Sequence, residues 1–458
     1  MHFRIAQAFA ATCLASVFFQ GAAARAEPPA GKTVYADVTL IDGTGAGARP
    51  HQDIVVSGER ILEVVPHGSE ADSDDAPATV IDLSGKFVIP GLIDSHVHMA
   101  TPPRPAEARA QLRRNLYGGV TAVRDMADDI RLVSELAREA RFAEIPSPDI
   151  YYVALFAGRL FFTDPRVAAA SMGVKPGTAP WMQAIDRKTD LKEAVTLARG
   201  TGATAIKIYA DLPPDLVAAI TEEAHRQHIQ AWAHSAVFPT RPADVIDAGV
   251  DTVSHVCYLA YQVEPVMLAS YEDHTPVQEH LLEQPEDPVL AGLFEDMVQR
   301  GTILDATGSL FVHYDAERKA HPERRPLRCT GPATTRLTRQ AWKAGVAIST
   351  GTDTVSGPEN PWPDVFDELI FLNRDVGMPA LETIRSATLV GARAAGQEKD
   401  MGTVEPGKLA NFVVLGADPL ADIENIRTVE ATVKRGQEYR RADYRPVTAE
   451  EMGDGDDD

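Results

Sequence analysis

An apolar run that ends in two histidines is the most restrictive feature of this chain. The run begins at Phe87 and closes with His96, Val97 and His98. Because successive side chains of a strand point to opposite faces, His96 and His98 project from one face while Val97 turns away. Two imidazoles on one face are able to bind one metal ion. A strand that merely ends in polar residues is the alternative for this motif taken alone.

Four further apolar runs end in residue types that bind or bridge metals. These residues are Lys207, His234, His255 and Asp353. Strand-like and helical segments alternate along this part of the chain, as in a parallel α/β fold. His234 and His255 are about 20 residues apart, which matches one strand-loop-helix step of a (β/α)8 barrel. The candidate ligands are therefore expected at the C-terminal ends of barrel strands, where the active sites of such barrels lie.

The pattern predicts eight barrel strands and several of the intervening helices. The strands are expected at 120–125, 150–155 and 302–306 and at runs that end at or near His98, Lys207, His234, His255 and Asp353, with helices at 106–117, 191–199 and 215–225. Residues 156–190 and 258–300 form long connections after the third and sixth strands. Connections of this length are typical of lids, and we expect these two to cover the active site.

Both ends of the chain are rich in short β-like segments separated by Gly and polar turns. They include residues 33–40, 53–56 and 61–65 near the N-terminus and 402–415 and 429–433 near the C-terminus. Periodicity alone shows only two β-rich ends.

Taken together, these residues resemble the amidohydrolase superfamily, in the branch of imidazolonepropionase-like proteins and bacterial Xaa-Pro-type dipeptidases. The resemblance implies an α/β fold, a distorted (β/α)8 TIM barrel over residues 91–400. It also implies a small β-sandwich domain formed from 27–90 and 401–445.

The resemblance also implies a binuclear metal site. His96, His98 and Asp353 would form one half of the site, and His234 and His255 the other. An unmodified lysine has no lone pair to offer a cation, but in binuclear members the lysine of the fourth strand is carboxylated by CO2. A carbamate on Lys207 would thus bridge two divalent metal ions, for which zinc suits the nitrogen and oxygen ligands. A buried lysine paired with an acid is the alternative for Lys207.

This site predicts hydrolysis of an amide bond in a dipeptide or N-acyl amino acid-like substrate. Two metals can share a hydroxide that attacks the carbonyl, with Asp353 as the general acid and base and His255 beside the developing oxyanion. Related deaminases carry a Glu three residues after the histidine of the fifth strand, whereas position 237 is Val. A lactonase or esterase, a cyclic-amide hydrolase of the imidazolonepropionase type and an inactive metal- or ligand-binding barrel are the alternatives.

Two residues are candidates for substrate binding. Tyr209 lies two positions after Lys207 and is expected to face the same way, and Arg159 lies in the first long connection. A packed tyrosine and an exposed loop arginine are the alternatives. The dipeptidase relatives carry a glycine-rich segment with a histidine after the third strand, which this chain lacks, so dipeptide specificity does not follow. Arg124 and Asp125 are expected to form structural hydrogen bonds.

Composition and the chain ends set the remaining expectations. The formal charge of the 458-residue chain is −22, which argues against nucleic acid or an anionic membrane surface as a partner. Residues 1–26 resemble a secretory signal peptide cleaved after Ala26, which predicts a periplasmic or secreted enzyme. Residues 446–458 are expected to be an acidic disordered tail. A homo-oligomer is left open.

The mature chain would keep two cysteines, Cys257 and Cys329. Two cysteines in so long a chain do not amount to a disulfide framework. Cys257 is expected to be a small buried core residue, with a distant thiol ligand as the alternative.

Overall fold

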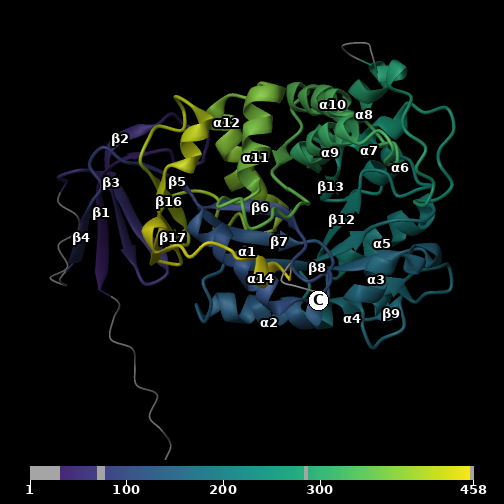
Figure 1. The fold of residues 1–458 in the computed structure, drawn as a ribbon, viewed down its shortest axis with the longest axis horizontal. Helices are drawn as coiled ribbons and strands as arrows, with labels where there is room; N and C mark the ends of the chain where they lie inside the picture. The colour runs from purple at the N-terminus through teal and green to yellow at the C-terminus, as the bar shows by residue number, and fades with distance from the viewer. Residues whose placement is uncertain (1–30, 70–77, 283–286, 454–458) are drawn as a thin grey trace, which may run out of the picture.

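Two β-sheet systems, one at each side of the molecule, organise the chain (Figure 1). The computed structural model describes residues 31–69, 78–282 and 287–453. A parallel barrel surrounded by helices holds the middle of the chain, and a separate sheet combines both of its ends. The predicted fold class, a distorted TIM barrel with a β-sandwich, is confirmed.

The barrel contains eight parallel strands in the order in which they occur in the chain. These are β6 (Leu92–Val97), β7 (Val120–Asp125), β8 (Asp149–Ala157), β11 (Ala205–Ile208), β12 (Gln230–His234), β13 (Thr252–Ser254), β14 (Ile303–Asp305) and β15 (Ile348–Ser349). Beyond β15 the chain returns to β6, since the Ser95 amide donates to the Thr350 carbonyl and the Asp353 amide to the His96 carbonyl, at 2.9 and 2.8 Å. These two bonds bring the first and last predicted ligands together.

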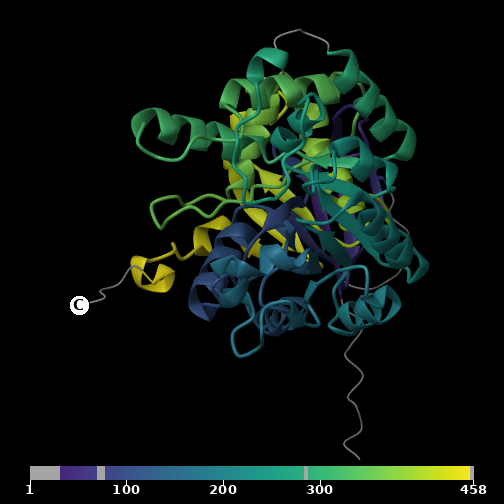
Figure 2. The same cartoon turned by 90° about the vertical axis from the view of Figure 1, so that its right-hand side faces the viewer.

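Helices form a layer around the strands (Figure 2). The longer ones are α1 (Pro105–Tyr117), α2 (Ile130–Arg141), α4 (Leu191–Gly200), α5 (Pro214–Arg226), α8 (Pro288–Arg300), α9 (Gly308–Ala320) and α10 (Gly331–Lys343). The shorter ones are α6 (Pro242–Asp247), α11 (Val365–Ile370), α12 (Ala380–Arg385) and α13 (Gly391–Ala394), with π-helical turns η4 (Phe371–Val376) and η5 (Ser386–Val390). The helices predicted at 106–117, 191–199 and 215–225 are confirmed.

Capping residues explain where several helices begin and end. The Asp190 carboxylate accepts a hydrogen bond from the Glu193 amide at the start of α4, which satisfies a backbone donor that has no partner within the helix. Gly301 ends α8 in the left-handed conformation at φ 73°, which glycine adopts without the steric cost of a Cβ.

The separate sheet is built from strands that are more than 300 residues apart in the chain. Its members are β1 (Lys32–Leu40), β2 (Arg49–Ser57), β3 (Arg60–Pro66), β4 (Ala78–Asp82), β5 (Phe87–Pro90), β16 (Phe412–Leu415), β17 (Val429–Lys434) and β18 (Gln437–Arg440). The first half of β1 pairs with β4 and its last two residues pair with β5. This branching lets the strands enclose a common apolar core that includes Tyr35 and Phe412, whose rings meet edge to face at 4.9 Å.

Both long connections fold against the barrel. The first contains η1 (Arg159–Thr163), α3 (Pro165–Ala170) and the short strands β9 (Thr178–Ala179) and β10 (Met182–Ala184), of which β10 extends the barrel sheet beside β8. The second begins with α7 (Val256–Leu259), η2 (Ala260–Gln262) and η3 (Glu279–Leu282). Their function as lids stays a prediction.

The segment after β18 differs from the expected disordered tail. After η7 (Arg441–Asp443), residues 446–453 include α14 (Ala449–Met452), and the Glu451 carboxylate pairs with Arg113 of α1 at 2.8 Å. Met452 packs against Ala110 of the same helix, so apolar contact and an ion pair hold this segment. Residues 454–458 and the predicted signal peptide at 1–26 lie outside the described residues.

Membrane-spanning helices were also sought. Among the described residues, none of the helices combines the length and the apolar character needed to cross a bilayer.

A disulfide joins Cys257 to Cys329 across 72 residues of sequence. Cys257 is buried, as expected, but it is neither a free core thiol nor a metal ligand. Strand β13 ends at Ser254 and α7 begins at Val256, so Cys257 does not continue the strand face of His255. The bond fastens the start of the second long connection to the segment that precedes α10.

Removing this disulfide should lower stability. Closing a loop of this length reduces the conformational freedom of the unfolded chain, and such bonds typically contribute about 2–4 kcal/mol. We expect the double variant Cys257→Ala, Cys329→Ala to lower the free energy of unfolding by that amount, measured by urea denaturation.

Reductant provides the matched control. Dithiothreitol should destabilise the wild type and leave the double variant unchanged. Equal stability of the oxidised wild type and the double variant would contradict a bonded pair.

Candidate metal centre

All six predicted metal-ligand residues lie at or just beyond the C-terminal ends of barrel strands. They are His96 on β6, His98 after β6, Lys207 on β11, His234 at the end of β12, His255 after β13 and Asp353 after β15. The structure therefore brings together residues that are up to 257 positions apart, as the barrel prediction requires.

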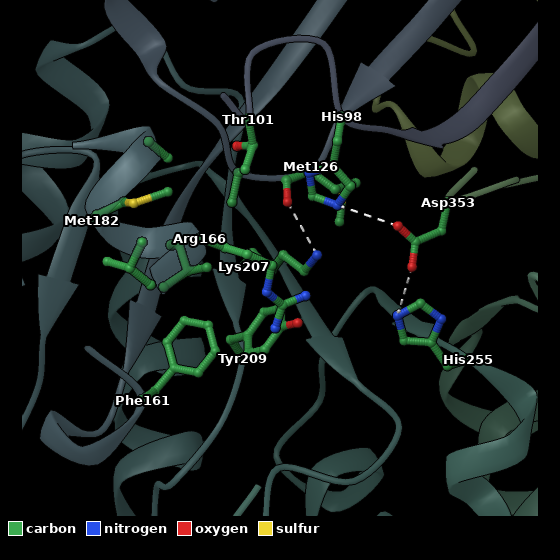
Figure 3. Close-up of a pocket in the computed structure, with 14 residues that line it drawn as sticks. His98, Thr101, Met126, Phe161, Arg166, Met182, Lys207, Tyr209, His255 and Asp353 are labelled. Atoms are coloured by element: carbon green, nitrogen blue, oxygen red, sulfur yellow. Dashed lines mark hydrogen bonds and ion pairs between the residues drawn. The ribbon is translucent and has the colours of Figure 1, made fainter. Parts of the chain in front are cut away.

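Asp353 lies at the centre of the cluster (Figure 3). Its Oδ1 is 3.4 Å from His98 Nε2 and 3.7 Å from His96 Nε2, and its Oδ2 is 3.7 Å from His255 Nε2. Ligand atoms of His96, His255 and Asp353 all lie within 4.8 Å of one another. One cation could thus be reached by two imidazoles and a carboxylate.

Lys207 is buried beside this group. Its Nζ lies 3.4 Å from His96 Nε2 and donates a hydrogen bond to the Met126 carbonyl at 3.1 Å. Burial lowers the pKa of Lys207 to about 8, although the carboxylates of Asp353, Asp128 and Asp305 oppose the shift. An amine with this pKa is neutral more often than an exposed lysine at neutral pH.

The buried imidazoles are held in the neutral form that metal binding needs. Burial, and then the charge of Lys207, lowers the pKa of His96 well below its usual value. Burial followed by His255 does the same for His234. Burial also lowers the pKa of His255 to about 4, against the opposing charge of Asp353.

His234 supplies the clearest test of whether these residues suit a metal. Within the described part of the chain, neither of its buried ring nitrogens has a hydrogen-bond partner. A buried polar group left without a partner costs about 1–3 kcal/mol. Coordination of a divalent cation would offset that cost, and neutral imidazoles with a carboxylate are ligands that such cations accept. The residues therefore fit a divalent metal ion.

Three residues that sequence analysis missed orient the imidazoles. His96 Nδ1 lies 2.9 Å from Asp305 Oδ2, and His98 Nδ1 lies 2.9 Å from Asp128 Oδ1. His255 Nδ1 lies 2.8 Å from Thr307 Oγ1. Partners of this kind fix the ring so that Nε2 faces the metal. Asp305 lies in the predicted seventh strand, so an acid at a strand end was the available signal.

Position 351, next to His96 and Asp305, has no room for a side chain. A Cβ on Gly351 would stand 2.2 Å from Asp305 Oδ1 and 2.6 Å from the His96 Cβ. Only glycine lets the chain after β15 approach both residues this closely.

Aromatic side chains from the barrel and both long connections surround the cluster. Tyr209 stacks 4.0 Å from the His234 ring and 4.4 Å from Phe161, and Tyr258 lies 5.4 Å from His234. Tyr209 thus faces the site, as predicted. Tyr258 follows Cys257 directly and has the buried Arg328, the neighbour of Cys329, 5.3 Å from its ring centre, so the disulfide helps to hold this wall.

The structure places Arg159 outside the pocket. Its side chain is 71% exposed and pairs with Asp186 at 2.8 Å, which is the alternative of a surface arginine. The arginine that lines the pocket is Arg166, seven residues later. No sequence signal separated these two arginines, because both occur in the same irregular connection.

The expected hydrogen bonds of Arg124 and Asp125 are only partly present. Asp125 Oδ2 accepts from the Met99 amide at 3.0 Å. The guanidinium of Arg124 is buried without a hydrogen bond to any described residue and lies 4.8 Å from the ring centre of Trp232. The ring provides a cation–π contact in place of polar partners, and burial lowers the pKa of Arg124 to about 9.

Comparisons with known proteins show similarity over most of the chain. The chain is 28% identical over 423 residues to imidazolonepropionase of Streptomyces griseus subsp. griseus, covering 88% of this chain and 95% of that protein. It is 22% identical over 425 residues to 5-methylthioadenosine/S-adenosylhomocysteine deaminase of Shouchella clausii, covering 84% and 86%. The crystal structure of a Xaa-Pro dipeptidase with bound methionine superimposes with a TM-score of 0.70 at 21% identity, covering 89% of this chain and all of that one.

A family model settles what these similarities have in common. The model of the amidohydrolase family matches residues 87–438, which span the whole barrel, β16 and β17 and end within β18. The resemblance that the strand-end residues carry is confirmed, and the chain belongs to the amidohydrolase family.

Proposed function

We propose that this protein is a binuclear metal-dependent amidohydrolase that cleaves an amide bond in a dipeptide or N-acyl amino acid-like substrate. The main observation behind this proposal is that four imidazoles, one carboxylate and one buried lysine converge at the C-terminal end of the barrel. This donor set is larger than one tetrahedral metal ion needs, which supports two ions rather than one.

His96, His98 and Asp353 would hold one ion, and His234 and His255 the other. The position of Lys207 supports a two-ion site, since its Nζ lies 3.4 Å from His96 Nε2 and a carbamate on it would supply anionic oxygen ligands. Zinc suits this set of nitrogen and oxygen ligands. When bound, the two ions would supply Lewis-acid activation of water and of the scissile carbonyl.

Asp353 is positioned to move the proton in this reaction. Its carboxylate faces His98 and His255 across the pocket, so it lies beside any water that enters the cluster. Asp353 would take a proton from the attacking water and pass it to the leaving amine. His255, as a ligand of the second ion, and Tyr209 border the same space, and the phenol of Tyr209 would donate to the oxygen on which negative charge develops.

A cyclic-amide hydrolase of the imidazolonepropionase type is the second candidate. The similarity to a protein of that name over 423 residues favours it. An ester or lactone substrate uses the same activated water and stays an alternative. Deamination is less favoured although a deaminase is among the relatives, because Val237 stands where deaminases of this superfamily carry the shuttling Glu.

Substitution of Asp353 tests the assignment. In wild type we expect turnover within a panel of dipeptides, N-acyl amino acids and cyclic amides. Asp353→Asn should lower kcat by about 10²- to 10⁴-fold, the typical contribution of a general acid-base group. Circular dichroism would check that the fold is kept.

Asp186→Asn is the matched control, because that carboxylate pairs with Arg159 outside the pocket. It should retain wild-type kcat. Full activity of Asp353→Asn would rule out the proposed role.

We also propose that the enzyme is exported. The disulfide between Cys257 and Cys329 supports this, because such bonds persist in oxidising compartments and are rare in the cytosol. We expect protein isolated from the periplasm or medium of an expressing bacterium to begin at Glu27, by N-terminal sequencing. Uncleaved protein confined to the cytoplasm would contradict export.

A further inference from the structure

The wall of the pocket opposite the candidate metal ligands has a chemical character of its own. The pocket has a volume of about 220 Å³, and the wall formed by β8 and the first long connection is mostly apolar. Its members include Leu155, Phe161, Val167, Ala170 and Met182. Such a surface suits an aliphatic or aromatic group of a substrate.

One cation interrupts this apolar wall. Arg166 lies in α3 and extends toward Lys207 and Tyr209 (Figure 3). Its side chain is 56% exposed, so a molecule in the pocket can reach it. Lys207, the lysine that also lines the pocket, is buried among the candidate metal ligands.

Asp164 holds the guanidinium in place without occupying all of it. Its carboxylate accepts from the Arg166 amide at 2.8 Å, from Nε at 3.1 Å and from Nη2 at 2.7 Å. These bonds use the Nε and Nη2 atoms and leave Nη1 unbonded to Asp164. Arg166 also interacts with the phenol of Tyr271, and the Nη1 edge can donate to a carboxylate that enters the pocket beside this ring.

The positive charge of Arg166 affects the pKa of His234 in the candidate metal centre. Burial dominates the lowered pKa of His234, but Arg166 is among the groups that lower it further. The bonds to Asp164, followed by the phenols of Tyr209 and Tyr271, raise the pKa of Arg166 above its usual value. The guanidinium thus remains charged and lies within electrostatic reach of the residues that would bind the reacting amide.

We infer that Arg166 binds a free carboxylate of the substrate while the apolar wall receives an adjacent apolar side chain. This inference rests on the proposed amidohydrolase function and narrows it. The substrate class is an acylated or peptidyl amino acid with an unblocked carboxylate and a Leu-, Met- or Phe-like side chain. Arg166 is then the specificity-determining residue, and Asp164 is its positioning residue.

The test compares free acids with their carboxamides. N-acetyl-L-leucine, N-acetyl-L-methionine and N-acetyl-L-phenylalanine would each be paired with the corresponding amide on the zinc-loaded enzyme. Both binding, by isothermal titration calorimetry, and kcat/KM would be measured. Wild type should prefer the acids by at least about tenfold, as expected for one charge-assisted hydrogen bond.

Variants of Arg166 separate recognition from structure. Arg166→Gln should remove the preference for acids by weakening the binding of the acids, and Arg166→Lys should restore part of this preference. Arg159→Gln is the matched control, since that arginine is exposed and paired outside the pocket, and should keep the full preference. Thermal melting would identify any variant that is merely unfolded.

The outcomes distinguish the inference from the function on which it rests. Acid preference in binding that depends on Arg166, without hydrolysis, would support the carboxylate site and count against the proposed reaction. A preference that survives in Arg166→Gln would place the carboxylate elsewhere, for example on the metal ions. That result would overturn the inference. Equal binding of acids and amides by the wild type would overturn it as well, and so would binding of neither.

Discussion

The structure depends on one constraint, which is that several neutral imidazoles and a lysine share a buried space at the end of a barrel. His96, His234 and Lys207 are almost completely removed from solvent, and His234 has no hydrogen-bond partner among the described residues. Such a cluster is unfavourable unless something compensates for the lost hydration. Divalent cations would provide that compensation, and the arrangement fits a site for such ions.

The backbone around the cluster shows where the fold accepts strain to present these side chains. His255, Thr307 and Asp353 follow the sixth, seventh and eighth barrel strands and have positive φ angles of 73°, 47° and 50°. Residues with a Cβ rarely adopt this conformation, and such residues concentrate at functional sites. The turn at each position aims a ligand, or the partner of a ligand, toward the centre of the barrel instead of along the strand.

Much of the barrel and of its candidate metal centre could be predicted from the sequence. The alternation of side chains along a strand and the spacing of successive strand-helix units are local properties of the chain. His96 and His98 share a face through a two-residue period, and Lys207 is recognised by its place at the end of the fourth strand. Asp305, Asp128 and Thr307 escaped notice because their role arises from contacts between strands that only the folded barrel creates.

Long-range pairing also explains the errors. The disulfide between Cys257 and Cys329 requires α7 to meet the segment before α10, and nothing in the sequence of either segment indicates the other. Arg166 and Arg159 are near neighbours in sequence, yet α3 turns one into the pocket and leaves the other at the surface. The position of a side chain within an irregular connection depends on packing, which periodicity does not encode.

The most direct test of this account is the metal content of wild type and Lys207→Ala, purified side by side with zinc and bicarbonate and analysed by plasma mass spectrometry. The account predicts about two equivalents of metal per chain in wild type and loss of metal and activity in the variant. One equivalent in both proteins would contradict it, because Lys207 would then be no bridging ligand and the centre would hold a single ion.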